Sequence, residues 1–237
     1  MPTPALTIIG LDADDTLWHN ESFFRQSQDR FSELLSEYAD TQTITQTLDT
    51  VEHKNLAVYG YGVKGFTLSM LEAALAITDA RLPAQRLQQI LELGREMMRH
   101  PVDLLPGVKQ ALAALSQRLP LVLITKGDLF HQESKLAASG VGEYFRGVEI
   151  VSTKSATTYA RAFQRFGADP GQAVMAGNSV RSDVLPALEA GSYAALVPYP
   201  LLWAHEAAEA PSGHPRFREL ECLGQLAPWI DALQARR

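Results

Sequence analysis

The sequence lacks several features that mark whole classes of protein. Its 237 residues include a single cysteine, Cys222, which excludes an internal disulfide framework and fits a reducing compartment. The net charge of -6 and the lack of a dense basic run argue against a nucleic-acid-binding surface. No apolar stretch is long enough to span a bilayer, and the start, Met1-Pro-Thr-Pro, lacks the positive charge of a signal peptide. These absences predict a cytoplasmic protein that binds neither nucleic acid nor membranes.

What the sequence does contain is a regular alternation of short apolar stretches and amphipathic ones. With 46% hydrophobic residues, the chain can bury a full α/β core and a small second domain. Alternating strands and helices predict a parallel, doubly wound sheet with right-handed crossovers. Strands are expected to begin near Leu6 and to span 121–124, 148–151, 173–176 and 194–197, with helices at 108–115, 131–139, 157–166, 182–190 and 223–233. The rest of the tail from Pro198 is expected to pack rather than to take part in chemistry.

A long helical region separates the first strand from this pattern. Helices are expected over 22–38, 43–58, 66–77 and from Pro83 to Met98, with no convincing strand among them. The sequence therefore predicts two domains. Residues 1–17 and 103–237 would form the α/β core, and residues 18–102 would form an inserted, all-helical domain.

The first strand leads directly into paired aspartates. A buried parallel strand places the residues after it at the carboxyl edge of the sheet, where open α/β proteins bind ligands. Asp12 and Asp14 would repel each other there unless a cation lay beside them, so the pair predicts a site for a hard metal ion such as Mg²⁺. Taken alone, the pair is also compatible with an Asp-rich turn that ends a strand.

Polar residues also come after three later strands. The second strand ends in Thr125-Lys126-Gly127, the third is followed by Lys154, and the fourth runs into Asn178 and Asp183. A hydroxyl, an ammonium group, carboxylates and a metal ion at one sheet edge are the groups that phosphoryl transfer requires. A lone lysine is usually an ordinary solvated side chain, so Lys154 gains its meaning from this ordered set.

In order along the chain, these residues resemble four motifs of the haloacid dehalogenase superfamily. The matching residues are Asp12-x-Asp14-x-Thr16, Thr125, Lys154 and Gly177-Asn178-Ser179-x-x-Ser182-Asp183. The match covers residues 6–17 and 105–197, and the inserted helices resemble the helical cap of that superfamily. Four motifs at successive strand ends make the resemblance specific for the superfamily, although not for a substrate.

The resemblance implies a role for each matched residue. Asp12 would attack phosphorus and form an aspartyl-phosphate. Asp14 would protonate the leaving alkoxide and later take a proton from water, for which burial and the Asp12 charge would raise its pKa towards neutrality. Thr125 and Lys154 would stabilise the phosphoryl group as further catalytic residues. Mg²⁺ would be held by Asp12, the carbonyl of Asp14 and Asn178, with Asp183 in support. Thr16 of the matched set would contact the substrate. Outside the matched set, Lys126 and Gly127 after the second strand would add a cation and a backbone that can approach an anion closely.

One matched position departs from the commonest pattern of the superfamily, which has an aspartate where this chain has Asn178. An amide can coordinate Mg²⁺ through its oxygen but adds no charge, so weaker metal binding and a direct role for Asp183 both stay open. Asp14 favours a phosphatase that acts on a small phosphorylated metabolite, because a halide leaving group needs no acid and the dehalogenase branch typically lacks this aspartate. The alternatives are a 2-haloacid dehalogenase-like hydrolase and a weakly active, phosphate-binding regulatory protein. Neither the substrate nor the oligomeric state can be read from the sequence.

A second motif, Gly60-Tyr61-Gly62-Val63-Lys64-Gly65, matches the G-x-G-x-x-G pattern of dinucleotide-binding sites. That pattern requires a preceding buried strand and a later strand that ends in an acidic residue, and the sequence around it offers neither. A loop of the helical domain is the better interpretation. Tyr61 and Lys64 would then contact the leaving group of the substrate.

Overall fold

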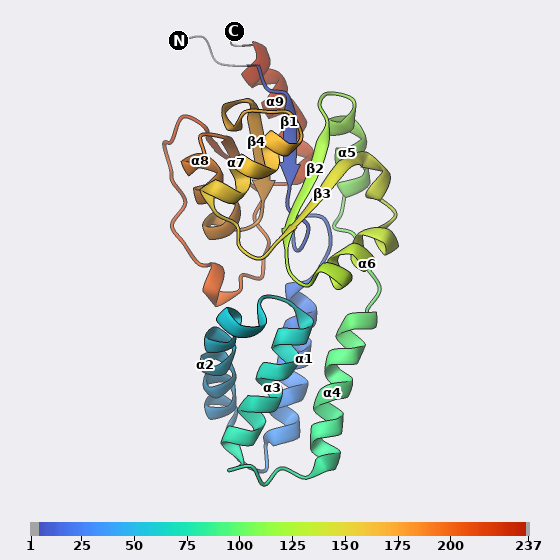
Figure 1. Ribbon diagram of the computed structural model, residues 1–237, viewed down its shortest axis with the longest axis vertical. Helices are drawn as coiled ribbons and strands as arrows, with labels where there is room; N and C mark the ends of the chain where they lie inside the picture. Colours follow the sequence, from blue (N-terminus) through green and yellow to red (C-terminus); the bar gives the residue numbers. More distant parts are fainter. Residues whose placement is uncertain (1–4, 236–237) are drawn as a thin grey trace. The chain divides into compact units, whose positions relative to one another are not determined.

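The computed structural model, shown in Figure 1, describes residues 5–235. The chain forms two compact units. The first unit contains residues 5–19, 102–126 and 132–235. The second unit contains residues 20–101 and the short segment 127–131.

The first unit is built on a parallel sheet of six strands in the order β3-β2-β1-β4-β5-β6. The strands are β1 (Ile8–Leu11), β2 (Leu121–Lys126), β3 (Phe145–Val151), β4 (Ala173–Gly177), β5 (Tyr193–Leu196) and β6 (Phe217–Glu219). β1 lies between β2 and β4, with Ile9 paired with both Leu121 and Val174. This order confirms the predicted α/β, doubly wound fold and brings the ends of β1, β2 and β4 together.

Helices cover both faces of the sheet, because successive strand residues point to opposite sides. Ile9 and Leu11 belong to one buried cluster, whereas Ile8 belongs to the other. The helices of this unit are α5 (Val108–Ser116), α6 (Leu129–Ser139, from residue 132 on), α7 (Ala156–Arg165), α8 (Leu185–Glu189) and α9 (Leu226–Ala235). Gly10 lies where α7 packs closely on the sheet, and a Cβ atom there would lie 3.0 Å from both the Met175 sulfur and the Phe163 ring, so a larger residue would require these side chains to shift.

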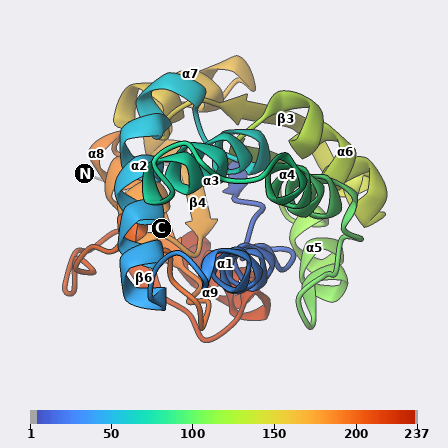
Figure 2. The ribbon, with the colours of Figure 1, turned by 90° about the horizontal axis from the view of Figure 1, so that it is seen from below.

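The second unit contains four helices, and its described residues form no strand. They are α1 (Glu21–Leu35), α2 (Thr41–Tyr59), α3 (Val63–Ile77) and α4 (Ala84–Arg99). The principal contacts join α1 with α2 and α4, and α3 with the same two helices, so that one apolar core lies between them. Figure 2 looks along α1 and α4. Within residues 5–235, no helix is both long and apolar enough to cross a membrane.

Two elements differ from their predicted form. β6 pairs with β5 at the edge of the sheet and was not predicted, because three residues are too few to show alternation. The segment expected to be one helix over 182–190 begins instead as a π-helical turn, Val180–Val184, which leads into α8. Such turns are frequent at functional sites, and this one carries Asp183.

Candidate active site

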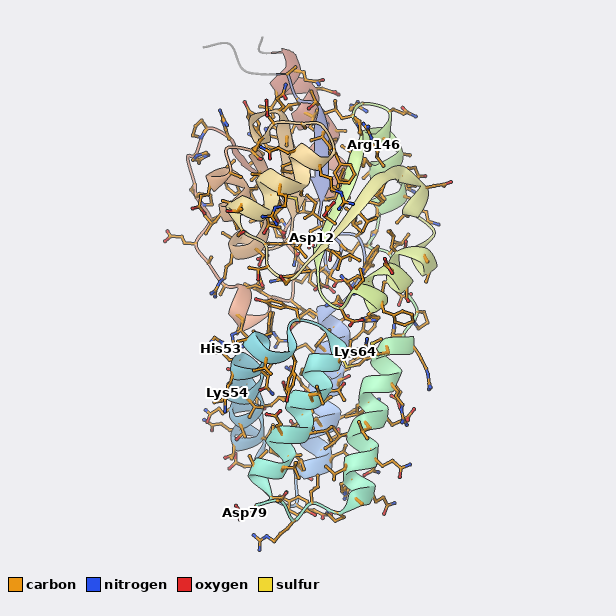
Figure 3. All side chains as sticks on the ribbon, in the orientation of Figure 1. Asp12, His53, Lys54, Lys64, Asp79 and Arg146 are labelled. Atoms are coloured by element: carbon orange, nitrogen blue, oxygen red, sulfur yellow. The ribbon has the colours of Figure 1, made fainter. Side chains whose placement is uncertain are left out.

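The candidate active site is built around Asp12, which directly follows β1 and is labelled in Figure 3. The Asp12 N–H donates to the Ala176 carbonyl at 2.9 Å, so the backbone holds this residue against the end of β4. The chain then turns sharply. Asp15 adopts a left-handed φ of 60°, a conformation that aspartate tolerates better than most residues, and its N–H donates to the Trp18 carbonyl at 2.8 Å.

Lys154 joins two buried carboxylates. Its ammonium group donates to Asp12 Oδ1 at 2.5 Å and to Asp183 Oδ1 at 2.7 Å. Burial acts to lower the pKa of Lys154, but the two carboxylates outweigh it and hold that pKa above its usual range. Burial and the neighbouring Asp183 raise the pKa of Asp12 to about 7, against the opposing effect of Lys154. Two carboxylates sharing one ammonium group leave a net negative charge, which favours a further cation beside Asp12.

Asp183 sits behind this pair, with both of its oxygens engaged. Oδ1 accepts from Lys154 and from the Tyr159 hydroxyl at 3.3 Å, and Oδ2 accepts from the Ser179 N–H at 3.0 Å. Gly177 is required for this approach, because a Cβ atom there would lie 2.2 Å from Asp183 Oδ2. Through these contacts Asp183 orients Lys154 and the loop after β4 (residues 178–184).

Asn178 lies beside oxygens from the first motif. With its amide nitrogen turned towards them, it donates to Asp12 Oδ2 at 3.2 Å, the Asp14 carbonyl at 3.1 Å and Thr16 Oγ1 at 3.3 Å. With the amide turned over, the Asn178 oxygen joins the oxygens of Asp12 and Asp14, a donor set suited to a hard cation such as Mg²⁺. Among the described residues, no three His, Cys, Asp or Glu side chains form a metal site, and the set at Asn178 instead uses a carbonyl and an amide.

The Asp14 carboxylate is held by three donors. Oδ1 accepts from Trp18 Nε1 at 2.6 Å and from Lys135 Nζ at 2.5 Å, and Oδ2 accepts from Gln132 Nε2 at 3.1 Å. Burial acts to raise the pKa of Asp14, but the Lys135 charge and these hydrogen bonds outweigh it and lower that pKa. The expectation that the pKa of Asp14 is raised towards neutrality was therefore wrong, because Lys135 on α6 reaches it.

The predicted catalytic residue Thr125 and the predicted substrate residues Thr16 and Lys126 lie around this centre. Thr16 Oγ1 is 3.3 Å from Asp12 Oδ2. Thr125 is buried, and its hydroxyl accepts from Gln132 Nε2 at 2.7 Å. Lys126 forms an ion pair with Glu206 and donates to Ser182 Oγ at 2.9 Å. Its charge is therefore already compensated.

The other three predicted substrate residues belong to the second unit. Gly127 has a φ of 142° and begins the segment 127–131. Lys64, on α3, contacts both carboxylate oxygens of Asp128 at 3.0 Å, and Tyr61 lies in the loop between α2 and α3. Helix α2, rather than a strand, precedes Gly60, so the G-x-G-x-x-G run has the wrong context for a dinucleotide site.

The sequence interpretation missed several residues of this network, among them Gln132, Lys135 and Glu206. Gln132 and Lys135 are three positions apart on α6, so their shared helix face was a usable signal. Glu206 lies in the tail that was expected to pack rather than to take part in chemistry, and it contacts Lys126, Ser179 and Ser182 of the candidate site. Nothing in the local pattern around Glu206 indicated these contacts.

A family model and a similar solved structure carry the same family description. The model of the haloacid dehalogenase-like hydrolase family matches residues 6–191. A haloacid dehalogenase-like family hydrolase from Xanthomonas campestris is 40% identical with a TM-score of 0.88, over 98% of this chain and 97% of that one. None of the curated proteins compared with the chain matches it.

Two more distant structures share the fold alone. One, described as the HAD-hydrolase YfnB from Bacillus subtilis bound to magnesium, is 15% identical with a TM-score of 0.68, over 96% of this chain and 100% of that one. The other, a 2-haloacid dehalogenase from Pseudomonas syringae pv. Tomato, is 19% identical with a TM-score of 0.64, over 96% of this chain and 98% of that one.

Proposed function

The chain belongs to the haloacid dehalogenase-like hydrolase family, and from that premise we propose that it is a Mg²⁺-dependent phosphatase acting on a small phosphate monoester. The observation that carries the proposal is the second carboxylate, Asp14, held by three donors two residues after Asp12. Displacement of a halide needs no such group, whereas an alkoxide leaving group needs a proton and the later attack of water needs a base.

In the proposed reaction, an Asp12 oxygen forms a bond to phosphorus while the bond from phosphorus to the leaving oxygen breaks. The leaving oxygen takes a proton from the protonated form of Asp14. Water then attacks the aspartyl-phosphate and returns a proton to Asp14, the bond from Asp12 to phosphorus breaks, and phosphate leaves. Lys154 keeps Asp12 oriented and compensates its charge throughout.

Mg²⁺ would be held by three oxygens, from the Asp12 carboxylate, the Asp14 carbonyl and the Asn178 amide. Asp183 would support this set by orienting Lys154 and the loop after β4. The bound ion would neutralise phosphoryl charge and lower the pKa of Asp12. The buried Thr125 hydroxyl would donate to a phosphoryl oxygen, and Thr16, whose hydroxyl lies 3.3 Å from Asp12 Oδ2, would add a second hydroxyl. The helical second unit would act as the cap, with Tyr61 and Lys64 contacting the leaving group of a phosphorylated metabolite in the cytoplasm.

Turnover of p-nitrophenyl phosphate with Mg²⁺ and with excess chelator tests this proposal. We expect activity that requires Mg²⁺, and no halide release from 2-chloropropionate. Phosphatase activity absent under both conditions would favour the phosphate-binding alternative, and halide release would favour the dehalogenase. A panel of phosphorylated metabolites would then identify the substrate.

Replacing the proposed nucleophile tests the mechanism itself. Asp12→Asn should lower kcat by at least about a thousandfold, because an amide of the same shape cannot attack phosphorus. The exposed Asp79, which follows α3 and is labelled in Figure 3, offers a matched control, and Asp79→Asn should leave kcat unchanged. A rate for Asp12→Asn close to that of the natural protein would remove Asp12 as the nucleophile.

A further inference from the structure

A chain segment that the proposed chemistry does not use reaches the candidate active site. Between β5 and β6 the chain forms the single 3-10 turn Ala204–Glu206. The Glu206 carboxylate accepts from the hydroxyls of Ser179 and Ser182, the latter at 2.5 Å, and forms an ion pair with Lys126. It therefore joins the end of β2 to the loop after β4, on either side of β1.

This contact is largely shielded from water. The side chains of Glu206 and Lys126 are 12% and 17% exposed, so removing one partner would leave a shielded charge without compensation. Lys126 also donates to Ser182 Oγ at 2.9 Å, which closes the network. Burial acts to raise the pKa of Glu206, but Lys126 and the two serine hydroxyls hold it below its usual range.

One serine connects Glu206 to the loop after β4. Ser179 directly follows Asn178, its hydroxyl accepts from the Ser182 N–H at 2.9 Å, and its own N–H donates to Asp183 Oδ2 at 3.0 Å. Asp183 in turn accepts from Lys154, which donates to Asp12. A shift of Ser179 would therefore move Asn178 and Asp183 together.

Two further contacts attach the same tail segment to the first unit. The Tyr199 hydroxyl lies 2.7 Å from His19 Nδ1, and Arg181 donates to the His205 carbonyl at 2.8 Å. With Glu206, the segment 198–206 is attached near the ends of β1, β2 and β4. It is thus part of the framework of the site.

We propose that Glu206 is a positioning residue of the active site: through Ser179 and Ser182 it holds the loop that carries Asn178 and Asp183 in the arrangement needed for Mg²⁺ binding. The consequence for turnover rests on the proposed function, whereas the consequence for metal affinity does not. Partners that orient metal ligands typically change metal affinity by about 10- to 100-fold when they are replaced.

The test compares Glu206→Gln with Glu209→Gln, a matched change at an exposed position in the same tail. Mg²⁺ half-saturation is measured by the rise in Tm and, at a temperature where every variant is folded, by the rate with p-nitrophenyl phosphate. We expect Glu206→Gln to raise the half-saturation about tenfold in both measurements. Glu209→Gln should leave it unchanged within about twofold.

Three results would overturn the proposal. They are a Mg²⁺ half-saturation in Glu206→Gln equal to that of the natural protein, an equal change in Glu209→Gln, and a natural protein whose Tm does not respond to Mg²⁺. If Glu206→Gln does not fold, Ser182→Ala removes one hydroxyl of the network and should raise the half-saturation in the same direction, by a smaller factor. A natural protein that binds Mg²⁺ but hydrolyses no phosphate ester would refute the proposed function, while the Tm titration would still decide the role of Glu206.

Discussion

Lys135 favours the ionised form of Asp14 and so affects when Asp14 can donate or accept a proton. Its ammonium group and the Trp18 indole share Asp14 Oδ1, and Gln132 occupies Oδ2. These donors favour the ionised carboxylate, which is the form that accepts a proton from water. Protonation of a leaving group needs the other form, so poor leaving groups should be hydrolysed best at low pH.

The ionised state of Asp14 should make turnover depend on both pH and the leaving group. Because the pKa of Asp14 is lowered, the rate with an alkyl phosphate relative to an aryl phosphate should rise as pH falls towards that pKa. Lys135→Met removes the largest opposing charge and should shift this rise to higher pH. The measurement is the ratio of kcat for the two substrates against pH, with Lys109→Met, at an exposed position of α5, as the control.

An unchanged profile in Lys135→Met would contradict the assignment of Asp14 as the group that titrates. A fall in both rates without a shift in the ratio would mean that Lys135 only holds the fold. The two substrates separate these outcomes, because an aryl leaving group needs little protonation.

At the scale of elements, residues directly after a strand are easier to predict from the sequence than residues that reach the same place from elsewhere. Asp12, Thr125 and Asn178 could be assigned to one edge because each lies at a strand end of a parallel sheet, and β1 lies between β2 and β4. Lys135 lies on α6, where its three-residue spacing from Gln132 indicates a shared helix face but does not identify Asp14 as the partner. Glu206 arrives from a segment without periodicity, so its contact depends on tertiary folding alone.

Asn178, in the loop after β4, should affect the affinity for Mg²⁺. If the Asn178 oxygen is a metal ligand, Asn178→Asp adds a charge beside the ion and should tighten Mg²⁺ binding by about tenfold, or roughly 1.4 kcal/mol. Turnover need not rise with metal affinity, since the new charge also repels a phosphate, so the measurement is a Mg²⁺ titration of Tm. An unchanged or weaker half-saturation would show that residue 178 does not bind the metal.

At the scale of the whole molecule, each unit contains a buried carboxylate with a raised pKa. Asp12 in the first unit and Glu52 in the second both have a pKa of about 7. Burial is the largest cause in each case, and a neighbouring carboxylate raises the pKa further: Asp183 for Asp12 and Asp49 for Glu52. A folded-state pKa above the unfolded value means that stability is fully present below the unfolded pKa and is lost as pH rises through about 7. Both units should therefore become less stable between pH 5 and 8.

The effects of Asp12 and Glu52 on the pH dependence of stability can be measured separately, because only Asp12 belongs to the proposed metal site. Mg²⁺ should raise Tm more at pH 8 than at pH 5 through Asp12, since binding requires the ionised carboxylate. Glu52→Gln should stabilise the second unit at pH 8 by about 1–3 kcal/mol and change little at pH 5, as expected when a buried ionisation is removed. Glu37→Gln is the matched control, because the Glu37 side chain is 72% exposed. Urea unfolding at both pH values would measure the difference, and an equal effect of Glu52→Gln at pH 5 and pH 8 would show that Glu52 does not ionise in this range.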